Sequence, residues 1–360
     1  MPLYAVYVLL FADTGLSEAQ ISLLFILWSG VAVLSEVPSG ALADRFSRRG
    51  VLVASSLFQA LGYALWILFP GFASFAAGFI LWGFGGALVT GAFEALLYEG
   101  LVERGAGEHY VKVNSAVNAV GLLGQLPSAG LATLLYWAGG YALVGWVSIG
   151  VCAASSLLAT RLPEPHRTSP TQDRPGYLTT LRIGIREALG GSAVRPAVLA
   201  VALIGAMDGL EEYFPLMARV WGIPTGVIPL AVLGLPLAGA AGAALGGRAN
   251  RLAGRQLAAM LVGALVVLGA MGLIAVPAGL AGVAFFWAIH QMVLVVADAR
   301  LQERIEGPAR ATVTSVASLG TELVGIGLFA AWAVDGLMLV VALWLLIALA
   351  LPKLLRRPAF

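Results

Sequence analysis

Several acidic residues stand inside stretches that are otherwise apolar, where an ionisable side chain needs a chemical reason. Asp208, Glu211 and Glu212 lie in the sequence MDGLEEYFPL, within a segment that we expect to be helical. Spacings of three and four residues place Asp208 near both glutamates on adjacent helix faces. Like charges that close favour retention of a proton on one of them, so Asp208 is a candidate for carrying a proton or contacting a solute. The alternative is that Glu211 and Glu212 lie in water at the outer surface.

Glu322, His290 and Gln291 are further candidates for the same chemistry. Glu322 follows Arg310 by twelve residues, which is about 18 Å along a helix. No basic residue of that helix can reach it, and a buried acid without a cation is expected to be protonated much of the time. A neutral acid bonded to a neighbouring helix is the alternative. His290 and Gln291 follow the aromatic run FFW, and the imidazole could either relay protons or bond a nearby carbonyl.

Glu36 stands two residues before Pro38 in the sequence SEVPSG. It precedes Asp44 by eight residues, or about 12 Å of helix. Pro38 frees a backbone carbonyl, which is tolerated where helices bend or line a cavity. A functional role and a local structural role for Glu36 both stay open.

The composition explains why charges in these stretches need a reason. The 360 residues are 60% hydrophobic and only 11% charged, whereas about a quarter of the residues of a soluble domain are charged. The sequence therefore predicts an all-α integral membrane protein. Cys152 is the only cysteine and the three histidines are scattered, so we expect no intrachain disulfide, metal site or cofactor. Without a nucleophile elbow or a phosphate loop, we expect neither an enzyme nor a nucleic-acid partner.

Apolar runs long enough to cross a bilayer, about 20 residues each, occur twelve times. A polar segment, 162–191, separates them into a first bundle, 1–161, and a second, 192–360; within it, 177–188 could form a short amphipathic helix on the membrane surface. The predicted spans are 1–14, 17–43, 50–69, 72–100, 112–137, 139–161, 193–219, 223–247, 255–276, 278–304, 310–334 and 336–353.

The basic residues predict the orientation of these spans. If the loop around Arg45 is cytoplasmic, alternation leaves only Arg219, of the 21 Lys and Arg residues, on the outer side. The positive-inside rule strongly favours that arrangement. We therefore expect both termini in the cytoplasm. We also expect the protein to be a monomer in the cell (inner) membrane.

The loop SGALADRFSRRGVL, residues 39–52, carries four charges in six residues. It resembles the signature loop of the major facilitator superfamily, the pattern Gly-x-Leu-Ala-Asp-Arg-x-Gly-Arg-Arg between the second and third transmembrane helices. Ser47 stands where that family usually has Gly. The matching positions are Gly40, Leu42, Ala43, Asp44, Arg45, Arg48 and Arg49.

The stretch LGGRANRLAGRQLAAML, residues 245–261, repeats this loop, with Asn250 and Arg251 in place of Asp44 and Arg45. Such weak internal symmetry is typical of transporters built from two membrane halves. The resemblance implies two six-helix bundles related by a pseudo-two-fold axis. Other pairs at nearly the same offset are Glu94 with Asp298, Glu99 with Glu303, and Tyr7 with Tyr213.

The resemblance also implies a conformational gate at the cytoplasmic side. Asp44 would cap the eleventh helix, while Arg45 and Arg49 would pair with acids such as Glu99 when that side is shut. Asn250 replaces the acid in the second copy, so we expect the second half to lock less strongly. The remaining charges expected at the gate are Arg48, Glu94, Arg251, Asp298 and Arg300.

The repeat makes the first span anomalous. When Tyr7 is aligned with Tyr213, the counterpart of about the first half of the predicted span 193–219 would lie before Met1. We expect either that the sequence upstream of Met1 encodes the missing apolar residues or that the first helix is truncated.

These observations predict a secondary transporter of a small organic solute that works by alternating access. Proton coupling through Asp208 or Glu322 is favoured, with efflux of drug-like or metabolite molecules that are neutral or cationic, because no intramembrane Lys or Arg is placed to bind an anion. A faint likeness of GLLGQLPSAG to an antiporter motif also favours efflux. A proton-coupled nutrient or sugar symporter, and a non-transporting sensor or partner subunit, are the alternatives.

Overall fold

The computed structural model describes residues 1–45, 47–164, 186, 190, 194–305 and 310–356. Within them, the side chains of 36–45, 90–91, 94–95, 111, 118, 122 and 310–312 are not described. The chain separates into two compact units, Met1–Arg174 and Pro175–Phe360. The amphipathic helix expected at 177–188 lies, apart from Arg186, outside the described residues. Helices, and no strands, make up the described parts of both units, which confirms the all-α prediction.

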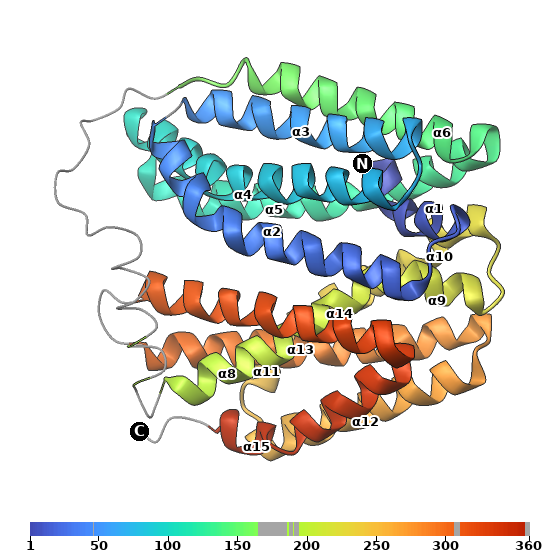
Figure 1. Ribbon diagram of the computed structural model, residues 1–360. Helices are drawn as coiled ribbons and strands as arrows, with labels where there is room; N and C mark the ends of the chain where they lie inside the picture. The colour runs from blue at the N-terminus through green and yellow to red at the C-terminus, as the bar shows by residue number, and fades with distance from the viewer. Residues whose placement is uncertain (46, 165–185, 187–189, 191–193, 306–309, 357–360) are drawn as a thin grey trace. The chain divides into compact units, whose positions relative to one another are not determined.

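The first unit is a bundle of long helices preceded by two short ones (Figure 1). Ser17 and Gln20 each accept a hydrogen bond from the other's backbone N–H at the start of the second span, which forms a capping box. The elements are η1 (Pro2–Ala5), α1 (Tyr7–Asp13), α2 (Glu18–Arg45), α3 (Arg48–Leu68), α4 (Phe72–Glu103), η2 (Gly107–His109), α5 (Tyr110–Leu123) and α6 (Gln125–Ala159).

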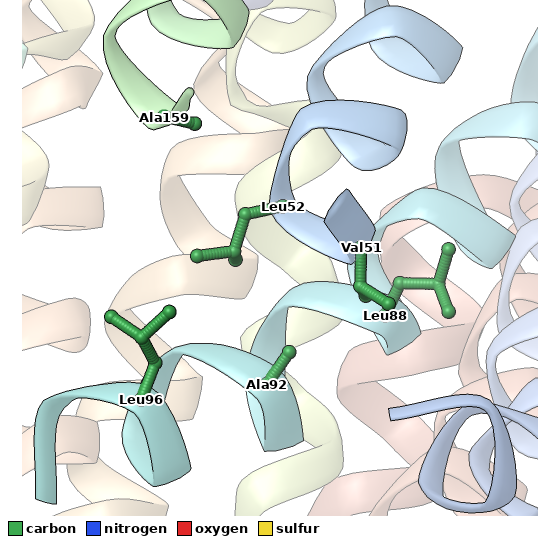
Figure 2. Close-up of a cluster of buried hydrophobic side chains, with 6 residues drawn as sticks. All are labelled: Val51, Leu52, Leu88, Ala92, Leu96 and Ala159. Carbon is green, nitrogen blue, oxygen red and sulfur yellow. The ribbon is translucent and has the colours of Figure 1, made fainter. Parts of the chain in front are cut away.

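Helices α3, α4 and α6 pack around a cluster of buried aliphatic side chains (Figure 2). Val51 and Leu52 of α3 meet Leu88, Ala92 and Leu96 of α4, and Ala159 of α6 closes the cluster. Val51 and Leu52 lie at the end of the basic loop in the sequence. Their burial therefore fixes where the loop that precedes α3 sits on the bundle.

The second unit repeats this plan with an interrupted first span. The segment predicted as one helix over 193–219 is α8 (Arg195–Gly205), the 3-10 helix η3 (Ala206–Tyr213) and α9 (Phe214–Val220). A 3-10 stretch in the middle of a helix often marks a functional hinge or a sequence under strain. The other elements are η4 (Thr225–Val227), α10 (Ile228–Val232), α11 (Gly234–Ala249), α12 (Gly254–Ile274), η5 (Pro277–Gly279), α13 (Leu280–Arg304), α14 (Arg310–Ala348) and α15 (Leu351–Leu354).

Two of the long helices contain breaks at positions where the sequence predicts separate spans. Helix α6 leaves helical geometry at Gly139 and Gly140, and α14 does so at Asp335 and Gly336. Gly140 and Gly336 have φ angles of 61° and 57°, which glycine adopts without the strain of a Cβ atom. Among the described residues, eight helical stretches are long and apolar enough to cross a membrane. Two of these, 107–159 and 313–348, each cover most of two predicted spans.

Glycine allows α11 and α13 to pack with their backbones nearly in contact. A Cβ atom on Gly242 would lie 1.9 Å from the carbonyl oxygen of Ala288, which is backbone and cannot swing aside. A Cβ atom on Gly239 would lie 2.7 Å from the ring of Trp287 and 3.2 Å from Cγ of Gln291. The packing of α11 therefore sets the positions of two residues that flank His290.

We expect Gly242→Ala to destabilise the second unit by about 1–3 kcal/mol, because the added methyl group forces α11 and α13 apart. Gly247→Ala is the matched control, since nothing lies within 4 Å of its Cβ position and alanine favours helix. Thermal unfolding of the purified protein, followed by tryptophan fluorescence, measures both. Equal melting temperatures in the two variants would show that the helices separate without cost.

Candidate functional site

Asp208, His290 and Gln291 form one hydrogen-bonded cluster within the second unit. Gln291 donates from Nε2 to Oδ1 of Asp208 at 2.7 Å. Nε2 of His290 lies 2.9 Å from the same oxygen. The two donors are neighbours on α13, while Asp208 belongs to η3, so residues more than 80 positions apart in the sequence meet at a single carboxylate oxygen.

The surroundings fix the imidazole and leave the carboxylate accessible. His290 is completely buried, and its ring stacks on Phe286 with centroids 5.9 Å apart and lies 5.1 Å from Trp287. The side chain of Asp208 is 46% exposed. Asp208 forms no ion pair with Lys or Arg among the described residues. The contacts with His290 and Gln291 are therefore at one oxygen of the Asp208 carboxylate, while part of this side chain remains accessible.

The position of Asp208 in an interrupted span limits what that space can be. An ionised carboxylate facing hydrocarbon costs several kcal/mol, so such groups face a partner or a water-filled cavity. Irregular backbone inside a membrane is likewise tolerated only against protein or a cavity. Both features of Asp208 thus point to a water-filled route and not to lipid. In this position the carboxylate can bind a proton, or it can accept a hydrogen bond from a donor group of a solute.

The other predicted acids are not part of this hydrogen-bonded cluster. The hydrogen bonds of Asp208 go to α13 and not to Glu211, which is exposed, or to Glu212, which is half-buried. Glu322 lies on an exposed face of α14, so the expectation of a buried acid is wrong. It is exposed because the inward positions of this stretch are taken by Val316, Ala317 and Gly325. Glu36 lies in α2, and its side chain is not described.

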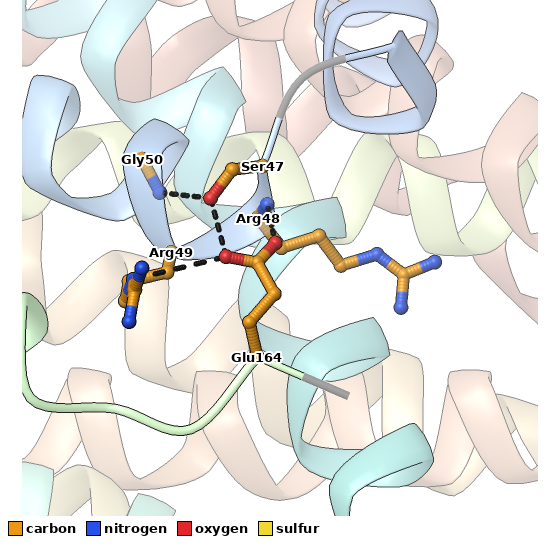
Figure 3. A network of polar contacts seen from close by, with 5 residues as sticks. All are labelled: Ser47, Arg48, Arg49, Gly50 and Glu164. Atoms are coloured by element: carbon orange, nitrogen blue, oxygen red, sulfur yellow. Dashed lines mark hydrogen bonds and ion pairs between the residues drawn. The ribbon is translucent and has the colours of Figure 1, made fainter. Parts of the chain in front are cut away.

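The basic loop in the first unit is fastened by Glu164, which lies just beyond α6 (Figure 3). Ser47 caps α3 by accepting a hydrogen bond of 3.0 Å from the backbone N–H of Gly50, and its hydroxyl donates to Glu164. Glu164 also accepts from the backbone N–H of Arg48 at 2.8 Å and lies 3.8 Å from Nε of Arg49. A carboxylate at a helix N-terminus is favourable because it meets the positive end of the helix dipole.

The ion pairs of this loop differ from those expected of a gate. Arg48, not Arg49, pairs with Glu99, and Arg49 faces Glu164 instead. Arg49 follows Arg48 by one residue on α3 and therefore points about 100° around the helix from it. The predicted gate residues Gly40, Asp44, Arg45 and Glu94 lie in helices whose side chains are not described at those positions.

The second copy of the loop is held by a buried arginine instead of an acid. Arg300 is 1% exposed and donates from Nε to Oδ1 of Asn250 at 3.2 Å. Its other nitrogens donate to the carbonyl oxygens of Asn250, Leu252 and Leu355. Asn250 also donates to Glu303 at 3.4 Å. Of the other gate residues predicted in this half, Arg251 and Asp298 are exposed.

Two of these anchoring residues were missed by sequence reasoning. The sequence places Glu164 in the polar segment 162–191, and Ser47 stands where the family pattern usually has Gly. The pattern Ser-x-x-Gly at the start of a predicted helix was a capping signal for Ser47. Nothing in the sequence links Glu164 to a loop more than 110 residues earlier. Among the described residues, no group of three or more His, Cys, Asp or Glu could hold a metal ion.

Comparisons with known proteins agree with this architecture. A family model described as Major Facilitator Superfamily matches residues 1–330, whereas no curated protein matches the chain. Similar solved structures include the nucleoside transporter NupG (12% identity, TM-score 0.72, covering 98% of this chain and 92% of that one). A D-xylose-proton symporter (17%, 0.66, 97% and 90%) and the POT family transporter PepTSo (14%, 0.69, 98% and 94%) are also similar. At these identities the likeness shows the fold alone.

We expect Glu164→Ala to lower the stability of the first unit by about 1 kcal/mol or somewhat more, because two hydrogen bonds at the start of α3 lose a charged acceptor. The ion pair with Arg49 adds little, since the partly exposed pair is screened by water. Glu108→Ala, in an 83% exposed side chain of the same unit, is the control. Thermal unfolding compares the variants, and a melting temperature for Glu164→Ala equal to that of the control would contradict the anchoring role.

Proposed function

The chain belongs to the Major Facilitator Superfamily, and on that premise we propose that it exports a small organic solute in exchange for protons, with Asp208 as the coupling residue. It is a multi-pass membrane transporter and not an enzyme. Alternating access between two halves is the mechanism expected of such a two-unit fold. The placement of both termini in the cytoplasm and of the chain in the inner membrane, as a monomer, belongs to the same proposal.

The accessible carboxylate of Asp208 is the observation that supports proton coupling. Its Oδ1 atom accepts a hydrogen bond from Gln291 and lies 2.9 Å from Nε2 of His290, which donates to it when that nitrogen carries the proton. Protonation makes one carboxyl oxygen a donor, so the carboxyl group then accepts fewer bonds. The cluster can therefore exist in two hydrogen-bonding arrangements that differ by one proton. A solute that contacts Asp208 or Gln291 would bind the two arrangements with different affinity, and such a difference is what coupling requires.

The charge of the cluster supports a neutral or cationic solute. Asp208 has no ion pair with Lys or Arg among the described residues, and its contacts there are with His290 and Gln291. A cationic or hydrogen-bond-donating group complements that carboxylate, while an anion would be repelled. Exchange of such a group for a proton keeps the charge of the site constant. This argument favours efflux by antiport over nutrient symport.

We expect Asp208→Asn to abolish proton-driven transport in reconstituted vesicles while solute exchange across the membrane persists. The amide keeps the size of the side chain but cannot bind and release a proton. Transport driven by an imposed pH gradient, measured beside exchange at equal pH, separates the two effects. Solute binding should also lose its dependence on pH.

Asp335→Asn is the matched control, because Asp335 is exposed at the break in α14 and far along the chain from the cluster. It should keep full gradient-driven transport. If Asp208→Asn transports against the solute gradient with the pH dependence of the native protein, Asp208 is not the coupling residue, and Glu322 becomes the next one to test by Glu322→Gln.

A further inference from the structure

We propose that His290 is a positioning residue that keeps its hydrogen on Nε2 and holds the carboxylate of Asp208 without itself carrying the coupling proton. This inference rests on the proposed transport function and deepens it by assigning the proton to one member of the cluster. It is carried by contacts within the second unit alone.

The contact between His290 and Asp208 decides which ring nitrogen carries the hydrogen. Nε2 lies 2.9 Å from Oδ1 of Asp208. A neutral imidazole donates from one nitrogen and accepts at the other, whereas an ionised carboxylate can only accept. Nε2 is therefore the donor whenever Asp208 is ionised, and Nδ1 is then the bare nitrogen.

The surroundings of Nδ1 disfavour a second hydrogen on the ring. Nδ1 of His290 is buried and has no hydrogen-bond partner among the described residues, and the side chain is 0% exposed. Either neutral tautomer leaves Nδ1 without a partner, so the contact at Nε2 decides between the two. The protonated ring is different, because it would place a charged N–H donor at Nδ1 with no acceptor for it. The ring is therefore poorly suited to take up the proton that Asp208 binds.

Neighbouring aromatic side chains hold the imidazole in this orientation. Phe286 stacks on it with centroids 5.9 Å apart and planes 10° from each other, and the ring of Trp287 lies 5.1 Å away. A half-turn of the imidazole would put the carbon Cε1 in the place of Nε2 and lose the hydrogen bond to Asp208. The packed ring therefore presents one fixed donor to the carboxylate.

Other charged residues of the second unit do not supply His290 with a partner. On α8, α11 and α12, which pack against α13, they stand at the helix ends, and on α13 itself they begin eight residues from His290, about 12 Å along the helix. Within the described part of the chain, Asp208 is the one titratable group that contacts His290. The charged residues considered are Arg195, Glu211, Glu212, Arg248, Arg255 and Asp298.

Replacement of His290 by an amide distinguishes a positioning residue from a proton relay. Neither glutamine nor asparagine binds a proton in this range of pH, so a relay is lost in both variants. The amide nitrogen of glutamine lies one carbon further from the backbone and can take the place of Nε2, whereas that of asparagine takes the place of Nδ1. The hydrogen bond to Asp208 is therefore lost only in His290→Asn.

We expect His290→Gln to retain proton-driven transport in reconstituted vesicles, at a reduced rate. His290→Asn should shift the pH profile of transport toward higher pH by about one unit, because the ionised carboxylate loses a donor and takes up a proton more readily. Solute exchange at equal pH shows that each variant is folded. If His290→Gln keeps this exchange but loses proton-driven transport, the ring carries the proton and the proposal is wrong. A native pH profile in His290→Asn would contradict it as well.

The position of the hydrogen is measured directly in a protein whose only histidine is His290. His109→Gln and His166→Gln remove the other two histidines. In lipid nanodiscs, NMR of histidine labelled with nitrogen-15 distinguishes an N–H from a bare ring nitrogen, and couplings to the hydrogens on the ring carbons identify Nε2. We expect an N–H at Nε2 and a bare Nδ1 at the pH of the transport assay. An N–H at Nδ1, alone or together with one at Nε2, would overturn the proposal.

These outcomes are distinguishable from failure of the proposed transport function, because the NMR measurement needs neither a solute nor a gradient. If Asp208→Asn keeps proton-driven transport while the NMR spectrum shows the hydrogen on Nε2, the transport proposal is wrong and the tautomer of His290 stands. If Asp208→Asn abolishes proton-driven transport while the hydrogen lies on Nδ1, the transport proposal stands and the positioning role of His290 is wrong.

Discussion

The cost of a charge in a medium that cannot solvate it governs the second unit. A carboxylate in a membrane span needs hydrogen bonds and access to water. Asp208 is bonded by residues of α13, and its side chain is 46% exposed. The 3-10 stretch η3 interrupts the span where Asp208 lies, and α13 supplies His290 and Gln291 from adjacent positions. The glycines of α11 matter for the same reason, because a Cβ atom at Gly239 would collide with Trp287 and crowd Gln291. The close packing of α11 on α13 therefore helps to fix the side chains around Asp208.

The two copies of the basic loop are held in place by side chains of opposite charge. In the first unit an acid, Glu164, reaches the backbone and capping side chain at the start of α3. In the second, the buried guanidinium of Arg300 binds backbone carbonyls at the end of α11 and beyond α15. Both join the segment that follows the last helix of the unit to the loop between its second and third helices. Asn250, the counterpart of Asp44 in the repeat, accepts a hydrogen bond from Arg300 through its amide oxygen.

The sequence predicted the elements better than the contacts between them. Spans follow from apolar length and from breakers such as Gly140 and Gly336, so they were placed nearly where the helices lie. Asp208, His290 and Gln291 were each recognised from a polar side chain in an apolar run, yet their meeting depends on packing between distant helices. Glu322 was wrongly expected to be buried, because position along a helix does not say which face turns inward. The 3-10 stretch at Asp208, residues 206–213, contains neither a proline nor two adjacent glycines that would predict a break in the helix.

The hydrogen bonds of Asp208 bear on how a proton could control a solute. A carboxylate that accepts from both His290 and Gln291 holds the amide in place, while the protonated form has less capacity to accept. On the proposed mechanism, protonation therefore frees Gln291, which is the more accessible of the two donors because His290 is fully buried. A solute that bonds Gln291 then has a different affinity for the two protonation states of the cluster. Coupling needs such a difference, because a ligand shifts an equilibrium only by the difference in its affinity for the two states.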